Sequence, residues 1–167
     1  MLSISPVLGF YDVKKDITLG CEASSGNLGA CILQENRPIA YTSRSLTETQ
    51  KSYAQMEKEL LSIVFGAERF SKYIYGKEVN VMTDHKPLLN CLKKPINTAP
   101  VRIQRLLLRL QRYNLKLNYV PGKYLFIPDM LNRAFVADNE HTDSERVLEN
   151  EANVIMLLLG TLTVQIT

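Results

Sequence analysis

Short apolar runs separated by turn-forming residues open the chain. Runs at 17–21 and 28–34 enclose the stretch Ser-Ser-Gly-Asn, and a third run at 37–43 follows another short polar link. Apolar runs of this length bounded by small and polar residues are typical of strands, and tight links favour antiparallel neighbours. The first part of the chain therefore predicts a three-stranded antiparallel meander.

A helical period follows the meander. From Tyr53 to Ile74 the apolar residues recur every three or four positions, which is the spacing of a one-sided amphipathic helix. We expect one long helix here, capped by Thr47 or Thr49 and ended by Gly76.

Strands and helices alternate in the next part of the sequence. We expect a last helix from Pro128 to about Phe135, since proline suits a first helical turn. The order β-β-β-α-β-α-α-β-α predicts an α/β protein: a five-stranded mixed sheet, with two parallel strands added to the meander and helices on both faces. The other elements in this prediction are strands at 79–83 and 115–120, a short helix from about Pro87, and a clear helix at 101–113.

Length and composition fit one globular domain with a tail. The 167 residues are 46% hydrophobic and 22% charged, which is ordinary for a soluble protein with a sizeable core. We expect a domain at 1–136 and an acidic, then apolar, tail at 137–167 that is poorly ordered or docks elsewhere. The apolar stretch 152–167 is too short and too interrupted for a good membrane span, so no membrane partner is predicted.

The cysteines point to a reducing compartment. Cys21, Cys31 and Cys91 show no CxxC or Cys/His ligand spacing, and no signal peptide is visible. This pattern predicts an intracellular protein without disulfides or zinc.

Basic residues gather in one stretch, although the net charge is only +3. Between His85 and Pro128 there are nine Lys and Arg residues and no Asp or Glu, which suggests a polyanion partner. Four arginines of the helix at 101–113 step by three, four and three and form one stripe. The stripe is either a solvated basic face or a ladder for phosphates. Acids lie far from it in sequence, so local ion pairs do not explain it.

Four carboxylates stand where functional groups gather in such sheets. Glu22 and Asp84 follow predicted strands, Glu59 lies beside the apolar stripe of the long helix, and Asp129 lies in the first turn of the last helix. If the first and fourth strands are neighbours, these acids can meet at one rim of the sheet. Clustered carboxylates repel one another unless a cation lies among them, and Mg²⁺ prefers oxygen ligands. Two such ions about 3.5–4 Å apart can activate water and stabilise the leaving oxygen of a phosphodiester.

Each acid also has a simpler explanation. A carboxylate after a strand, like Asp84, is usually a turn or cap residue, and an acid in a first helical turn, like Asp129, favours the helix dipole. Glu57 and Glu59 flank the apolar stripe on its two sides, so periodicity alone does not choose between them.

Longer blocks of sequence narrow these alternatives. They are IAYTSRSLTETQKSYAQMEKELLSIVFGAERFSKYIYGKEVNVMTDHKPLL, then APVRIQRLLLRLQRYNLKLNYVPGK, then IPDMLNRA. In this order they resemble the ribonuclease H domain in the reverse transcriptase polyproteins of gypsy-type LTR retrotransposons, over about Val7 to Phe135. The resemblance implies the ribonuclease H-like fold, a five-stranded mixed sheet flanked by helices.

The same resemblance implies an activity and its setting. Members of the family use two Mg²⁺ ions, with Mn²⁺ as a substitute, to cut the RNA strand of an RNA/DNA hybrid, leaving a 3′-hydroxyl and a 5′-phosphate. The implied partners are the hybrid and the polymerase domain of the same polyprotein. The implied place of action is the cytoplasm, in a retrotransposon particle, with the nucleus as an alternative.

The resemblance also assigns catalytic and metal-binding residues. It selects Glu59 rather than Glu57 in EKELL, Asp84 in TDH, Asp129 in PDMLNR, and Glu22 in Glu-Ala-Ser, where the family has Asp-Ala-Ser. The extra methylene of glutamate moves the carboxylate by about 1 Å, whereas productive sites tolerate about 0.5 Å, so we expect metal binding with a reduced rate. The predicted nucleic-acid-binding residues are Ser24, Lys86, Arg102, Arg105, Arg109, Arg112 and Lys123.

Three functions stay open on the sequence alone. The first is an active or weakly active ribonuclease H. The second is a catalytically decayed or domesticated domain that binds nucleic acid without cutting it, which Glu22 and the atypical tail favour. The third is a structural or interaction module that uses the apolar C-terminal segment.

Overall fold

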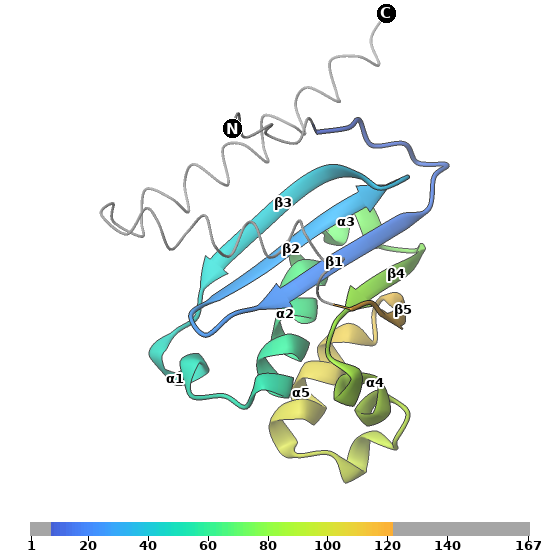
Figure 1. Ribbon diagram of the computed structural model, residues 1–167. Coiled ribbons are helices and arrows are strands. Elements are labelled where there is room, and N and C mark those ends of the chain that lie inside the picture. Colours follow the sequence, from blue (N-terminus) through green and yellow to red (C-terminus); the bar gives the residue numbers. More distant parts are fainter. Residues whose placement is uncertain (1–7, 122–167) are drawn as a thin grey trace, which may run out of the picture. The chain divides into compact units, whose positions relative to one another are not determined.

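Five strands form one mixed sheet in the computed structural model, which describes residues 8–121 (Figure 1). They are β1 (Ile17–Ala23), β2 (Asn27–Gln34), β3 (Arg37–Ser45), β4 (Glu78–Thr83) and β5 (Asn114–Tyr119), in the order β3-β2-β1-β4-β5. β1, β2 and β3 pair antiparallel, whereas β4 runs parallel to both β1 and β5. The predicted fold class, a meander extended by two parallel strands, is confirmed.

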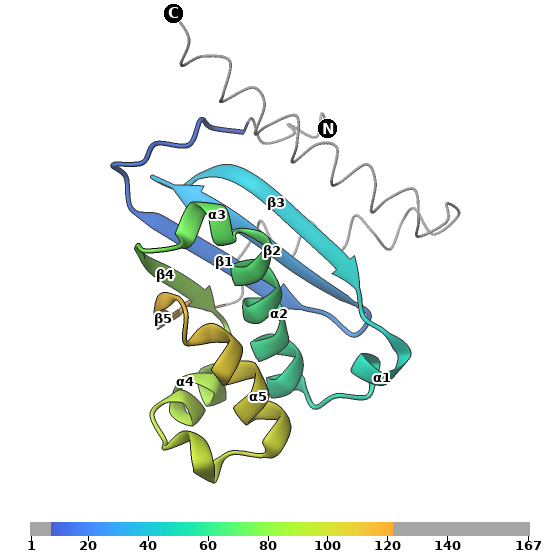
Figure 2. The ribbon, with the colours of Figure 1, turned by 180° about the vertical axis from the view of Figure 1, so that it is seen from behind.

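The main helices pack against one face of this sheet. α2 (Gln55–Arg69) crosses β1 and β2, and α5 (Val101–Leu110) lies beside α2, as Figure 2 shows from behind. The shorter helices are α1 (Glu48–Lys51), α3 (Ser71–Ile74), α4 (Lys86–Leu92) and the 3₁₀ helix η1 (Ile96–Thr98). The helix expected at 128–135 lies outside the described residues, so helices on both faces stay a prediction. No helix within residues 8–121 is both long and apolar enough to cross a bilayer.

The single long helix expected between the Thr47 or Thr49 cap and Gly76 is wrong, because this stretch forms three helices, α1, α2 and α3. Thr47 caps only the short α1, through a capping box. Ala54 is extended, with φ −59° and ψ 151°, and the Glu57 carboxylate accepts a hydrogen bond from its N–H, so a new helix starts there. Phe70, with φ −98° and ψ 18°, separates α2 from α3. The apolar period continues because Tyr53, α2 and α3 pack against one core, whereas α1 has no buried residue.

Other helix ends agree better with the pattern. Gly76 follows α3 with a φ of 75°, a conformation that glycine adopts at little cost. The helix expected at 101–113 ends earlier, at Leu110, because the chain must turn before β5 begins at Asn114. The Tyr113 N–H donates to the Leu110 carbonyl in this turn, at 3.0 Å.

Gly66 lets α2 approach the sheet closely. A Cβ atom at this position would lie 2.8 Å from the Ala30 Cβ and 3.0 Å from the Cys21 Sγ, closer than packed atoms come. Glu59 lies on the same helix, about two turns before Gly66. The small side chain at 66 therefore helps to set how far Glu59 stands from β1.

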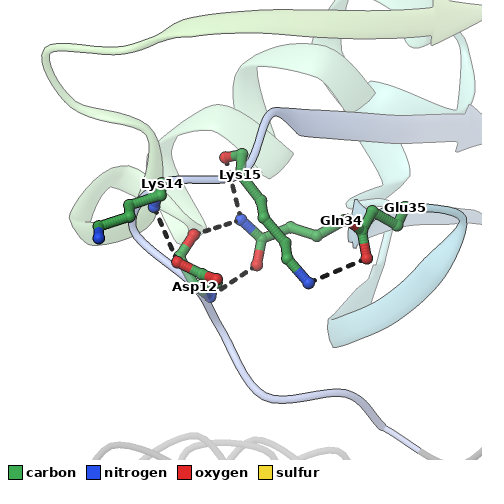
Figure 3. Close-up of polar contacts among 5 residues, drawn as sticks. All are labelled: Asp12, Lys14, Lys15, Gln34 and Glu35. Carbon is green, nitrogen blue, oxygen red and sulfur yellow. Dashed lines mark hydrogen bonds and ion pairs between the residues drawn. The ribbon is translucent and has the colours of Figure 1, made fainter.

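Gln34 fixes the segment that leads into β1 (Figure 3). Its side chain is 3% exposed; its Oε1 accepts from the Asp12 N–H at 2.8 Å, and its Nε2 donates to the Asp12 carbonyl at 2.7 Å and the Lys15 carbonyl at 3.2 Å. Lys15 also forms a 2.9 Å ion pair with Glu35 in the turn between β2 and β3. These contacts hold the start of β1, so the strand is anchored at the end opposite Glu22.

Candidate active site

Strand pairing brings Glu22 and Asp84 to the same rim of the sheet. β1 and β4 are parallel neighbours, and their register pairs Gly20 with Met82. Glu22 and Asp84 each lie two residues further along these strands, at the carboxyl ends. Adjacent strands are about 4.8 Å apart, so the two acids are close neighbours, Glu22 half-buried and Asp84 exposed. The condition set by the sequence, that the first and fourth strands be adjacent, is met.

Glu59 reaches this rim from α2. Its side chain is buried, with 4% exposure. The carboxylate accepts a hydrogen bond from the Gln55 Nε2 at 2.7 Å and another from the backbone N–H of Ala23, the residue that follows Glu22. Gln55 also donates to the Ala23 carbonyl at 3.3 Å. The end of β1 and the first turns of α2 therefore both fix the position of the Glu59 carboxylate.

The three acids share one electrostatic environment. Burial is the largest cause that raises the pKa of Glu59, and the negative charges of Asp84 and Glu22 raise it further. The hydrogen bonds from Gln55 and Ala23 favour the ionised form and lower the pKa, and the net result is about 7. Three of the four predicted acids thus meet at one rim, and the fourth, Asp129, lies outside the described residues.

The carboxylate oxygens at the rim are the type of ligand that a hard divalent cation takes, but the carboxylates that the structure describes do not surround a common point. Within residues 8–121, no group of three or more acidic, histidine or cysteine side chains is spaced to hold a metal ion. Carboxylates repel one another without a cation between them, and Glu59 is hydrogen-bonded to Gln55 and Ala23. Oxygen donors of this kind are the ligands that Mg²⁺ and Mn²⁺ prefer, so the described residues of the rim have the donor type for such ions but not the spacing of a metal site.

Glu57 has a different, structural role. Its carboxylate accepts from the Ala54 N–H at 3.0 Å and from the Arg102 guanidinium at 3.0 and 3.1 Å. The same guanidinium lies 4.0 Å from the centre of the Tyr53 ring. Glu57 therefore starts α2 and ties it to α5, which leaves Glu59 as the glutamate of α2 that faces the rim.

The arginine stripe of α5 divides into two pairs. Arg109 forms a bidentate ion pair with Glu68 of α2, at 2.8 and 2.6 Å, and Arg102 binds Glu57 as described. Ion pairs therefore do explain half of the stripe, because α2 and α5 are neighbours in space although far apart in sequence. Arg105 and Arg112 are exposed, and the prediction of phosphate contacts now rests mainly on these two.

The remaining predicted contacts have varied surroundings. The Ser24 hydroxyl accepts from the Asn27 N–H at 2.9 Å and helps to form the turn between β1 and β2. The Lys86 ammonium lies 4.7 Å from the centre of the Tyr119 ring, and Lys123 lies outside the described residues. The contact of Lys86 with Tyr119 was not predicted, since the place of Tyr119 at the end of an alternating strand indicates only a strand residue.

Comparison with known proteins identifies the family. Residues 12–113 match the family described as the RNase H-like domain found in reverse transcriptase. The chain belongs to this family. It is 33% identical over 156 residues to the Retrovirus-related Pol polyprotein from transposon 297 of Drosophila melanogaster, covering 91% of this chain and 14% of the polyprotein. It is 37% identical over 128 residues to that from transposon gypsy of the same organism, covering 76% and 12%.

Solved structures agree on the RNase H-like fold. RNase H1 from the archaeon Halobacterium salinarum superposes with a TM-score of 0.58 at 11% identity, covering 73% of this chain and 98% of that one. The foamy viral protease-reverse transcriptase in complex with RNA/DNA hybrid gives a TM-score of 0.57 at 19% identity, covering 68% of this chain and 16% of that one. This RNase H-like domain therefore spans only a small part of the polyproteins and reverse transcriptases that it resembles.

Proposed function

We propose that the chain is the ribonuclease H domain of a gypsy-type retrotransposon Pol polyprotein, and that it cuts the RNA strand of RNA/DNA hybrids in the presence of Mg²⁺ or Mn²⁺. The observation that carries this proposal is the meeting of Glu22, Glu59 and Asp84, from β1, α2 and β4, at one rim of an RNase H-like sheet. Cleavage would leave a 3′-hydroxyl and a 5′-phosphate.

The comparisons support the substrate and setting of this proposal. The relatives are Pol polyproteins, and one structural neighbour was solved with an RNA/DNA hybrid. We infer that the polymerase domain of the same polyprotein is the working partner. We propose the cytoplasm, within a retrotransposon particle, as the place of action, with the nucleus as the alternative.

The four acids share the task of binding metal ions in the proposed reaction. Glu22, Glu59 and Asp84, with Asp129 as a fourth ligand, would hold two divalent ions, which supply activation of the attacking water and stabilisation of the leaving 3′-oxygen. The Ala23 N–H and the Gln55 amide fix the direction of Glu59. Burial of Glu59 lowers the local dielectric constant, which strengthens its interaction with any bound cation.

Glu22 is the weak point of this arrangement and the reason for a second candidate function. Its backbone is fixed, because β1 pairs Glu22 with Gly29 of β2, so the longer side chain cannot be accommodated by moving the strand. A misplacement of about 1 Å can reduce a rate about 100-fold. A nucleic-acid-binding domain with no remaining cleavage is therefore the alternative; the interaction-module hypothesis concerns the tail, outside the described residues.

A cleavage assay separates these functions. The full chain, Glu22→Asp and Asp84→Asn would be incubated with a hybrid whose RNA strand is fluorescently labelled, with Mg²⁺, with Mn²⁺ and with EDTA. We expect metal-dependent cleavage to 3′-hydroxyl products, a loss of at least about 100-fold in Asp84→Asn and a gain of up to about 100-fold in Glu22→Asp. Hybrid binding without cleavage by the chain and by Glu22→Asp would instead establish the decayed domain.

A further inference from the structure

An exposed aromatic ring and a lysine lie side by side next to Asp84. Tyr119, the last residue of β5, is paired in register with Thr83, and the Val120 N–H donates to the Thr83 carbonyl at 2.9 Å. Lys86 opens α4 two residues after Asp84, and its Nζ lies 4.7 Å from the centre of the Tyr119 ring. β5 and α4 thus lie side by side (Figure 1).

This pair differs from the contact between Arg102 and Tyr53. Arg102 lies over Tyr53 but is neutralised by Glu57. No ion pair joins Lys86 to a carboxylate within the part of the chain that the structure describes. Lys86 is exposed and Tyr119 is 40% exposed, so both the charge and part of the ring face solvent.

We propose that Lys86 and Tyr119 form a phosphate-binding pair that holds the backbone of the RNA/DNA hybrid next to the carboxylate rim. Lys86 binds the phosphate, and Tyr119, which sequence analysis does not assign to any site, positions the ammonium. The proposal rests on the proposed function, because it takes the hybrid as the ligand.

The physical reason is the charge of the substrate. A nucleic-acid backbone that approaches Glu22, Glu59 and Asp84 brings phosphates towards three acids, and this repulsion must be offset close by. Lys86 is the cation nearest to Asp84 in sequence, and it stands on a short helix directly after the acid. The face of an aromatic ring attracts an ammonium and restricts its directions, so less freedom is lost when the phosphate binds.

The experiment measures binding of a fluorescent RNA/DNA hybrid to the full chain by anisotropy, in EDTA and over a range of salt concentrations. Lys86→Met is expected to weaken binding at least about 3-fold at 0.1 M salt and to reduce the slope of log K against log salt by about 0.9, the value of one phosphate contact. Tyr119→Leu is expected to weaken binding about 2- to 5-fold, and Tyr119→Phe, which keeps the ring, less than 2-fold.

Two controls make the outcomes decisive. Lys72→Met removes an exposed lysine from α3, at the opposite end of the sheet, and is expected to leave binding within 2-fold of the unchanged chain. In Lys86→Met, the further change Tyr119→Leu is expected to have no effect, because the ring then has no ammonium to position. Thermal melts check that each variant is folded.

Several results would overturn the proposal. If Lys86→Met binds the hybrid as well as Lys72→Met does, Lys86 does not contact a phosphate. If the effects of Lys86→Met and Tyr119→Leu add in the double variant, Tyr119 does not act by positioning Lys86. These results can be distinguished from a failure of the proposed function. Metal-dependent cleavage that Lys86→Met leaves unchanged would refute the phosphate-binding pair but not the ribonuclease activity. If the variants change hybrid binding as expected but the chain shows no metal-dependent cleavage, the ribonuclease activity is refuted and the phosphate-binding pair is not.

Discussion

The burial of Glu59 makes a prediction about stability that does not depend on activity. The side chain is 4% exposed, and its pKa rises from 4.5 to about 7, first through burial and then through the charges of Asp84 and Glu22. In Glu59→Gln the charge is absent, and the side-chain carbonyl can still accept hydrogen bonds from Gln55 and Ala23. Without divalent metal, we therefore expect this variant to be more stable than the unchanged chain at high pH.

The sign and size of the effect follow from the two pKa values. Below about pH 4.5 the carboxyl is protonated in the folded and unfolded states, so it costs nothing. Between pH 4.5 and 7 the unfolded chain loses the proton first, the cost grows, and above pH 7 the full cost is present. A rise from 4.5 to about 7 corresponds to about 3 kcal/mol, at about 1.4 kcal/mol per pKa unit.

Urea unfolding, followed by circular dichroism in EDTA, measures this difference. At pH 8, Glu59→Gln is expected to raise the free energy of unfolding by up to about 3 kcal/mol, and at pH 5 by much less. Glu57→Gln, which changes the neighbouring glutamate outside the rim, is the matched control and is expected to show no such pH-dependent gain. Equal effects of Glu59→Gln at both pH values, or a loss of stability at pH 8, would refute the reasoning.

Three further predictions concern α2 and α5. Gly66→Ala places a Cβ 2.8 Å from a side chain of β2, so we expect the free energy of unfolding in urea to fall by about 1–3 kcal/mol and hybrid cleavage to be slower. The control Gly26→Ala, whose Cβ would have no atom within 4 Å, is expected to leave stability nearly unchanged. Glu57→Gln removes a partly exposed ion pair, so unfolding should change by less than about 1 kcal/mol and cleavage should persist. The double variant Arg105→Gln, Arg112→Gln is expected to reduce the salt slope of hybrid binding by about 1.8 with an unchanged melting temperature.

Each of these predictions has a clear contrary result. A stable Gly66→Ala protein with full cleavage would show that α2 can move away from the sheet without harm to the rim. Loss of cleavage in Glu57→Gln would mean that the wrong glutamate of α2 has been chosen. An unchanged salt slope in the arginine double variant would show that α5 does not contact the phosphates of the hybrid.

The sheet is predictable from sequence because its signals are local. Turn residues between 23 and 28 and the short apolar runs on each side define the β1–β2 hairpin within one stretch of chain. The parallel pairing of β1 with β4 could only be assumed when the acids were predicted to meet, since periodicity carries no information on which distant strands become neighbours. The breaks at Ala54 and Phe70 were hidden for a related reason: apolar spacing reports which residues face the core, and that spacing persists where the backbone leaves the helix.

The candidate site was predictable in part. The positions of Glu22 and Asp84 at strand ends follow from the strand pattern, whereas the choice of Glu59 over Glu57 needed either a family resemblance or the contact between Glu57 and Arg102. The ion pairs of α5 with α2 are tertiary contacts, so sequence distance could not reveal them. Tyr119 gave no signal in sequence, because its meaning depends on Lys86 lying beside it.

The most direct test of the central claim locates a metal ion. Crystals of the full chain soaked in Mn²⁺ would be measured for anomalous scattering, with crystals of Asp84→Asn as the control. We predict anomalous peaks within about 2.5 Å of carboxylate oxygens of Glu22, Glu59 and Asp84, and weak or absent peaks in the variant. Mn²⁺ bound only elsewhere, or three carboxylates that remain apart at saturating Mn²⁺, would contradict a shared metal site.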